Sequence, residues 1–350
     1  MADRIYLDHA ATTPLLPQAR AAMADGLAAW ANPSSPHAEG RAARAALEEA
    51  RARIRAALGW PHHLIFTSGA SEAIGIAIGR AVADTRLVSA VEHDAVLRTT
   101  GAAGGLPVDE AGIVQVGEVP ARALVAVQSL NNETGVLQPL DDIAARVRAA
   151  GGIVLADCAQ SAGKLALPDA DLIAVSAHKL GGPPGIGALL VRDLAMLRPT
   201  GGQEQGYRGG TENVPAALGF AAALEAGAPW MDRPAALRAR LEAGVVAAGG
   251  EVVAAGTPRL PTIGSYRLPG VPAASQLIRL DMAGIAVSAG SACSSGSVRP
   301  SHVLAAMGWD ESAAREVIRV SFGPDTVAAE IDRFLDVWTQ LARRAPAGAA

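Results

Sequence analysis

Lysine and cysteine are both scarce in this chain of 350 residues. Of its 30 basic side chains only two are lysines, Lys164 and Lys179, and arginine supplies the rest. The two cysteines, Cys158 and Cys293, are too few for a disulfide framework, and no cysteine or histidine spacing indicates a zinc site. A chain that uses lysine so rarely makes each of its lysines a candidate for a specific role.

Long apolar runs and a large net charge are also missing. The alanine-rich stretch AALGFAAALEAGAPW is interrupted by Glu225 and Pro229 and is too short to span a bilayer. The net charge of −4 gives no electrostatic argument for binding nucleic acid or an anionic membrane. The opening MADRIYLDHA has charged residues before any apolar run, unlike a signal peptide. We therefore expect a cytoplasmic protein without a direct nucleic-acid or membrane partner.

Short apolar segments alternate with helical segments through the first two thirds of the chain. These segments lack polar alternation, which predicts an α/β fold with a mostly parallel central sheet and helices on both faces. One long helix is expected over residues 36–59, with Ser35 as its N-cap. The last third has shorter strands and predicts a smaller α+β C-terminal domain. We expect a large domain at 16–232 and a small domain made of 1–15 and 233–350.

Polar residues follow the predicted strands at the points where the strands end. The carboxyl ends of parallel strands meet at one edge of a sheet, where ligands bind. The sequence therefore predicts one shared site at this edge. The residues concerned are Ser68 to Ser71, Glu92, His93, Asn131, Asn132, Asp157 and Ser176 to Lys179.

Several of these groups together match the requirements of pyridoxal phosphate. The turn FTSGASE opens a helix whose N-terminus can bind a phosphate. Asp157 can keep a heteroaromatic nitrogen protonated, and Gln160 follows within reach of the same ring. Lys179 can form a Schiff base with the cofactor, and His93 can face its ring. Each residue alone has an ordinary structural explanation, such as a helix cap or a surface lysine, so it is the combination that indicates the cofactor.

Nucleotide-binding motifs are missing from the sequence, and its two cysteines lie in different settings. No GxxxxGK[ST] loop is present and no GxGxxG opens a helix, which argues against a nicotinamide-dependent dehydrogenase. Strand alternation turns Cys158 away from Asp157 and predicts an inert packing cysteine. Cys293 lies instead in SAGSACSSGS, whose glycine and serine content predicts a mobile loop.

Long segments of the sequence resemble the cysteine desulfurases of the class V aminotransferase family. They are YLDHAATTP, NPSSPHAEGRAAR, FTSGASEA, EHDAVL, NNETGVLQP, DCAQSAGK, SAHKLGGPPGIGALLVR, GGQEQGYRGGTEN and SAGSACSSGSVRPSHVL. They occur in family order from about residue 4 to about residue 335, and the NifS/IscS type fits best. The resemblance implies the PLP-dependent transferase fold type I and an enzyme that removes sulfur from L-cysteine.

The resemblance assigns the ring of pyridoxal phosphate to four residues. Lys179 would form the Schiff base, and Asp157 would pair with the pyridine nitrogen. Gln160 would contact the ring hydroxyl. His93 would stack on the ring and serve as an acid and base.

The resemblance also assigns the phosphate and the quaternary structure. The phosphate would be bound by Ala70, Ser71, Ser176 and His178. Thr211 would join them from a second subunit, which implies a homodimer with its active sites at the interface.

The remaining assignments concern the substrate. Asn132, which would also contact the cofactor, and Arg319 would hold the carboxylate of L-cysteine, a task that suits a guanidinium. Cys293 would attack the substrate sulfur, which leaves L-alanine and a persulfide on the enzyme. A free thiol is only partly ionised at neutral pH, so deprotonation by His93 or by the substrate amine would assist.

Three alternatives stay open from the sequence. The chain could be a selenocysteine lyase, another PLP-dependent lyase or aminotransferase of the same fold, or a non-catalytic scaffold that retains the fold. The sulfur acceptor is also open, among iron–sulfur scaffold proteins, tRNA thiolation, nitrogenase maturation and other routes. The sequence departs from the family pattern at Leu155, Cys158 and Ile74, none of which is a core catalytic group.

Overall fold

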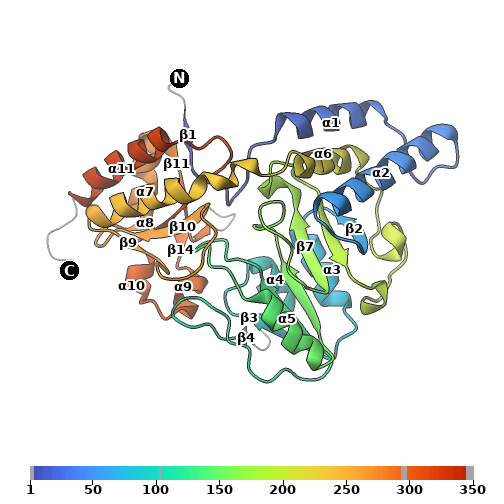
Figure 1. Ribbon diagram of the computed structural model, residues 1–350, viewed down its shortest axis with the longest axis horizontal. Helices are drawn as coiled ribbons and strands as arrows, with labels where there is room; N and C mark the ends of the chain where they lie inside the picture. Colours follow the sequence, from blue (N-terminus) through green and yellow to red (C-terminus); the bar gives the residue numbers. More distant parts are fainter. Residues whose placement is uncertain (1–3, 102–104, 293–297, 344–350) are drawn as a thin grey trace.

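The computed structural model describes residues 4–101, 105–292 and 298–343 (Figure 1). Its larger sheet has seven strands in the order β2-β8-β7-β6-β5-β3-β4. The strands are β2 (His63–Thr67), β3 (Thr85–Ser89), β4 (Gly105–Leu106), β5 (Ala123–Gln128), β6 (Ile153–Asp157), β7 (Leu172–Ser176) and β8 (Gly187–Val191).

The sheet is mostly parallel, as predicted, with one strand reversed. Strand β8 is antiparallel to both of its neighbours, β2 and β7, whereas β7, β6, β5, β3 and β4 run parallel to one another. The link from β7 to β8 is only residues 177–186, which is too short for the crossover that a parallel pair needs.

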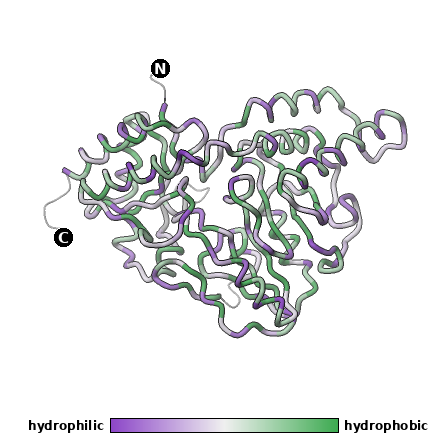
Figure 2. Tube along the Cα trace, viewed as in Figure 1, coloured by the Kyte–Doolittle hydropathy of each residue, from purple (hydrophilic) through white to green (hydrophobic). Residues whose placement is uncertain are grey.

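Helices cover both faces of this sheet. One face packs on α2 (Ala38–Ala57), α5 (Leu140–Ala149) and α6 (Val214–Glu225). The other face packs on α3 (Ala70–Arg80) and α4 (Asp94–Thr100). Along β5 the side chains alternate between these two cores, with Val125 and Val127 on the first and Leu124 and Ala126 on the second. The apolar strands seen in Figure 2 are therefore buried on both sides, which confirms the expected layers.

Helix α1 (Pro17–Ala28) packs outside α6 (Figure 1). The long helix expected at 36–59 is α2, but its N-cap is His37 and not Ser35. The Nδ1 atom of His37 accepts a hydrogen bond from the N–H of Gly40 over 3.2 Å. A side chain on Gly40 would clash with Ser35, because its Cβ would lie 2.3 Å from the Ser35 carbonyl oxygen. Ser35 packs against the first turn instead of capping it.

A second, four-stranded sheet has the order β12-β15-β10-β9 and is antiparallel. Its strands are β9 (Glu251–Val252), β10 (Ile263–Arg267), β12 (Ser288–Ala289) and β15 (Val317–Ser321), and its main helices are α7 (Pro234–Ala247), α8 (Ala273–Met282) and α11 (Ala328–Ala342). Strand β1 (Ile5–Tyr6) pairs in parallel with β11 (Ile285–Ala286). Shorter elements are β13 (Ser291–Ala292), β14 (Val298–Arg299), α9 (His302–Ala306) and α10 (Glu311–Ala314).

The second sheet has a hydrophobic core of its own. This core contains Leu7 from the N-terminal segment together with Tyr266, Phe334 and Trp338. In Figure 1 the first and the last described elements, β1 and α11, both lie on the side of this sheet. This is the α+β unit expected in the last third of the chain, and the boundaries at 15/16 and 232/233 stay a prediction. Among the described residues, no helix combines the length and the apolar character that crossing a bilayer requires.

Candidate active site

A cavity of about 600 Å³ opens at the carboxyl ends of the parallel strands, and residues of the second sheet complete its wall. We call it the front cavity. It gathers ten of the residues that the sequence analysis singled out: Ala70, Ser71, His93, Asn132, Asp157, Gln160, Ser176, His178, Lys179 and Arg319. Thr211 is exposed and does not line it. Cys293 lies outside the described residues.

Lys179 sits in the 3₁₀ turn Ala177–Lys179 that follows β7. The residue is half-buried, and the partial removal of its amine from water lowers the pKa of that amine to about 8. The nearby carboxylate of Asp157 opposes the shift, because a negative charge favours the protonated amine. A free Lys179 amine is therefore neutral far more often near neutral pH than an ordinary lysine, although the protonated form still predominates below pH 8, and the neutral amine is the state required of a base.

Asp157 ends β6 and begins the turn that carries Gln160. Its Oδ1 atom accepts a hydrogen bond from the N–H of Ala159 over 2.9 Å, which orients the carboxylate. Gln160 donates from Nε2 to the carbonyl of Ala10 over 2.8 Å. Within the described part of the chain nothing donates to its buried Oε1 atom. A buried acceptor without a donor is costly, so this atom is suited to a hydroxyl of a bound group.

The turn between β2 and α3 forms a cradle for an anion. Gly69 has φ 154°, a conformation that a side chain disfavours. A Cβ on Gly187 of β8 would lie 2.7 Å from the Cα of Gly69 and 2.4 Å from the carbonyl oxygen of Val175. The two glycines thus let the turn lie directly against β8. The free N–H groups at the start of α3 then face the cavity beside Ser71 and Ser176, as a phosphate site requires.

His93 caps α4 and also lines the front cavity. Its Nδ1 atom accepts a hydrogen bond from the N–H of Ala95 over 3.2 Å. Burial lowers the pKa of His93, and the charge of Lys179 lowers it further, while Asp157 acts in the opposite direction. The ring is therefore neutral near pH 7, and because Nδ1 accepts, Nε2 carries the proton.

Arg319 enters the site from β15 of the second sheet and is 5 % exposed. Its Nη2 donates to Oδ1 of Asp8 over 2.8 Å, and its Nη1 donates to the carbonyl of Asn132 over 3.1 Å. The buried Nε has no partner among the described residues. An oriented guanidinium with an unused donor is suited to hold a carboxylate.

The sequence analysis missed residues that border the site. Glu133 is buried, and its Oε2 accepts a hydrogen bond from Ser301 Oγ over 2.5 Å. A Cβ on Gly290 would lie 2.6 Å from the same oxygen. Glu133 therefore contacts both ends of the segment that contains Cys293. The motif NNETG contains Glu133, but the sequence does not show that this carboxylate meets residues more than 150 positions away.

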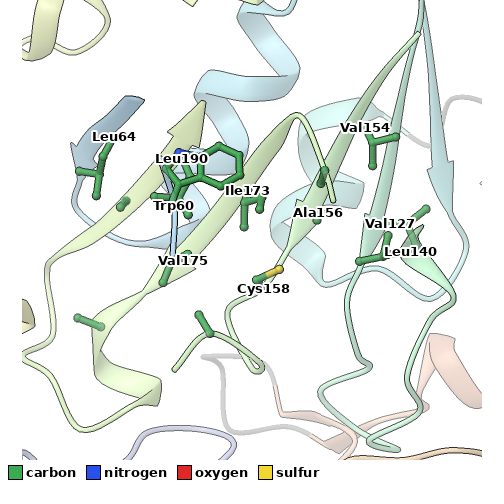
Figure 3. Close-up of a cluster of buried hydrophobic side chains, with 14 of the residues drawn as sticks. Trp60, Leu64, Val127, Leu140, Val154, Ala156, Cys158, Ile173, Val175 and Leu190 are labelled. Carbon is green, nitrogen blue, oxygen red and sulfur yellow. The ribbon is translucent and has the colours of Figure 1, made fainter. Parts of the chain in front are cut away.

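Cys158 is a packing residue, as predicted from strand alternation. It is fully buried, and Figure 3 shows its sulfur in the apolar cluster that includes Ala156 and Ile173. Burial raises the pKa of its thiol to about 12. Cys158 is thus neither ionised nor accessible near neutral pH.

Comparison with known proteins shows the family to which the chain belongs. The family model for class V aminotransferases matches residues 5–334. The chain belongs to this family. It is 37 % identical to a cysteine desulfurase of Gluconacetobacter diazotrophicus over 95 % of this chain and 92 % of that protein. It is also 37 % identical to an IscS-like cysteine desulfurase of Mycobacterium tuberculosis, over 99 % of this chain and 98 % of the relative.

Solved structures of NifS-like proteins share the fold of this chain over almost its whole length. A NifS-like protein of Rickettsia africae has a TM-score of 0.88 at 28 % identity, covering 97 % of this chain and 99 % of that one. Another NifS-like protein gives a TM-score of 0.88 at 29 % identity with the same coverage. Within its family the chain is therefore NifS/IscS-like, with the PLP fold type I and a requirement for pyridoxal phosphate. The cradle, Asp157 and the unpartnered Gln160 Oε1 fit that cofactor.

Proposed function

We propose that this chain converts L-cysteine to L-alanine and transfers the sulfur to Cys293 as a persulfide. The observation that carries the proposal is that Lys179, Asp157 and Arg319 line one cavity, with the neutral ring of His93 beside them. The relatives named above as cysteine desulfurases support the choice of reaction.

Pyridoxal phosphate supplies the electron sink that stabilises negative charge at the α-carbon of the substrate. The residues that would hold it are Asp157 at the ring nitrogen, Gln160 at the ring hydroxyl, His93 and Asn132 at the ring, and Ala70, Ser71, Ser176 and His178 at the phosphate. Lys179 would provide the covalent attachment.

Arg319 would orient the substrate by its carboxylate. The Asp8 carboxylate and the Asn132 carbonyl fix two of its nitrogens, so the fork does not have to be ordered when substrate binds. The side chain of Asn132, which also lines the front cavity, would supply a neutral contact beside it.

Lys179 would then remove the α-proton of the substrate with its Nζ atom. Its pKa of about 8 makes the amine basic enough to accept the proton and gives it a larger neutral fraction at pH 7 than an ordinary lysine has. His93, which carries its proton on Nε2, would exchange protons with the substrate from its own place in the wall of the front cavity.

The sulfur step requires a thiolate. The Cys293 sulfur would attack the substrate sulfur, so that a sulfur–sulfur bond forms and the carbon–sulfur bond of the substrate breaks. The carbon fragment takes up protons and leaves as L-alanine. The chain has only two cysteines, and the burial of Cys158 supports Cys293 as the nucleophile.

The finer parts of the proposal concern partners. We propose a cytoplasmic homodimer in which Thr211 of each subunit completes the phosphate site of the other, and its exposure in the single chain leaves it available for that contact. The persulfide would pass to acceptor proteins, including iron–sulfur scaffolds. Selenocysteine would be a competing substrate in the same cavity.

The reaction is tested by measuring the release of alanine and sulfide from L-cysteine. The variants Cys293→Ala and Cys158→Ala are compared, the second as the control. Cys293→Ala should keep pyridoxal phosphate and bind L-cysteine but release no sulfide. Cys158→Ala should keep most of the activity. Full activity in Cys293→Ala would refute the persulfide route, and a colourless protein unchanged by borohydride would support a non-catalytic scaffold.

A further inference from the structure

A second cavity of about 290 Å³ lies against Lys179. We call it the rear cavity. Lys179 lines both the rear and the front cavity, so this residue is part of the wall between them. Lys164, the other lysine of the chain, also lines the rear cavity. Both lysines of the protein therefore line the rear cavity.

Lys164 is tied to the front cavity through the turn that follows β6. Its Nζ donates a hydrogen bond to the backbone carbonyl of Gln160 over 3.1 Å. The turn itself is closed by a backbone hydrogen bond of 2.9 Å from the N–H of Lys164 to the carbonyl of Ser161. One short segment thus places Asp157 and Gln160 in the front cavity and Lys164 in the rear one.

The surroundings of Lys164 disfavour a positive charge. Burial, and then the charge of Lys179, lowers the pKa of Lys164 to about 7. His9 is neutral beside it, because burial and the charge of Lys164 lower the pKa of that ring to about 4. Asp325 is the one carboxylate among the described residues that line the rear cavity, and Arg233, which is exposed, adds a cation.

The residues around Lys179 carry both positive and negative charges. The charge of Lys179 lowers the pKa of His93 and of His178. The pKa of Lys179 is in turn shifted by the charges of Asp8, Asp157 and Arg319. The two carboxylates favour the protonated state of Lys179. Of the two lysines that line the rear cavity, Lys164 therefore gives up its proton first and is the neutral partner when Lys179 is charged.

We propose that Lys164 is a positioning residue that exchanges protons with Lys179 across the rear cavity. The proton moves from the Nζ of charged Lys179 to the neutral Nζ of Lys164, which holds it against the Gln160 carbonyl and releases it to solvent. No electron is transferred, and the cavity has room for a bridging water. The inference rests on the proposed function, in which Lys179 must be neutral to accept a proton from the substrate.

The full-length apoprotein allows a direct test. Reductive methylation with ¹³C-formaldehyde labels amines, and here the lysine signals come from two residues beside the N-terminal amine. NMR titration from pH 5 to pH 11 should give midpoints of about 7 for Lys164 and about 8 for Lys179. In Lys179→Met, the Lys164 midpoint should rise by about half a pH unit or more, because the neighbouring charge is gone.

Matched variants exclude a general effect of charge. Arg233→Met removes an exposed cation of the same cavity and should leave both midpoints unchanged because solvent screens that charge. Lys164→Arg retains a permanent charge and should lower the Lys179 midpoint. A Lys164 midpoint near 10, or one that Lys179→Met does not move, would overturn the proposal whether or not Lys164 variants fold.

Kinetics of the holoenzyme separate proton exchange from a structural role. Lys164→Met and Lys164→Arg should both lower kcat for alanine release about tenfold, with KM little changed and the acid limb of the pH profile displaced. If the hydrogen bond to Gln160 were the whole role, Lys164→Arg would restore kcat, and the proposal would be wrong. If the two lysines titrate as a coupled pair but the enzyme releases no alanine, the proposed function is refuted, whereas the coupling between Lys164 and Lys179 still stands.

Discussion

Arg319 is held in position by Asp8, whose Oδ1 accepts a 2.8 Å hydrogen bond from its Nη2. The two residues are 311 positions apart in the sequence. They meet because the N-terminal segment runs beside β15, where Asp8 forms a bridge with Ser321. The carboxylate both neutralises the guanidinium and directs its free edge into the front cavity.

Removing this carboxylate should weaken substrate binding more than it slows the reaction. We expect Asp8→Ala to raise the KM for L-cysteine about tenfold, and Asp8→Asn to raise it less, since an amide oxygen can still accept. Asp332→Asn is the matched control, because Asp332 pairs with Arg240 at the surface. Steady-state alanine release measures all three, and an unchanged KM in Asp8→Ala would show that Asp8 does not orient Arg319.

The accessibility of Cys158 can be measured with a thiol reagent. In native Cys293→Ala the remaining thiol should not react with iodoacetamide at pH 7.5, because Cys158 is fully buried and its pKa is raised to about 12. Unfolding in urea should expose one reactive thiol per chain. Mass spectrometry of the alkylated protein counts both, and labelling of the native variant would contradict the packing role.

Lys179 should destabilise the apoprotein at neutral pH. Its pKa is about 8 in the folded chain against an ordinary value of 10.5, so between these values the unfolded chain binds more protons and stability rises with pH. The penalty is complete below pH 8, on the order of 3 kcal/mol, and absent above pH 10.5. Lys179→Met should therefore raise the melting temperature of the apoprotein at pH 7, and the difference should vanish by pH 11. Scanning calorimetry checks the sign, and a lower melting temperature at pH 7 would contradict it.

Outside the site, the main prediction concerns the contribution of Glu204 to the free energy of unfolding. Its buried carboxylate accepts hydrogen bonds from Arg51 over 2.7 Å and from the N–H of Phe66 over 2.7 Å. Glu204→Gln removes the buried counter-charge of the Arg51 guanidinium and leaves only the exposed Glu48, so it should lower the free energy of unfolding by about 3 kcal/mol. Glu48→Gln, which alters the exposed partner of the same arginine, should cost less than about 1 kcal/mol. Urea unfolding compares them, and equal losses would refute the distinction.

The residues at the ends of the parallel strands could be predicted from sequence, because strand order does not change the edge at which they lie. Lys179, Asp157 and His93 were found in this way, and so was the inert position of Cys158. Asn132 is also a strand-end residue, although its role comes from the family resemblance. Arg319 rests on the resemblance alone, because no local pattern links it to the strand ends.

What could not be predicted depends on contacts between distant segments. Asp8 contacts Arg319, and Glu133 contacts Ser301, through packing between segments that are far apart in the sequence. The reversal of β8 follows from a short link that the apolar pattern alone does not reveal. Ser35 is wrong as the N-cap because α2 begins at Ala38, which places His37 at the cap position. The contribution of Thr211 to a second subunit stays a prediction.

The insertion of β8 between β2 and β7 has a consequence for synthesis of the protein. The cradle at Gly69 is complete only when Gly187 lies against it, and these residues are separated by more than a hundred positions. A nascent chain on the ribosome therefore has no cofactor site until β8 has emerged and joined the sheet. Loading with pyridoxal phosphate is thus a late event in the biogenesis of the enzyme, and chain fragments that end before β8 cannot bind the cofactor at this turn.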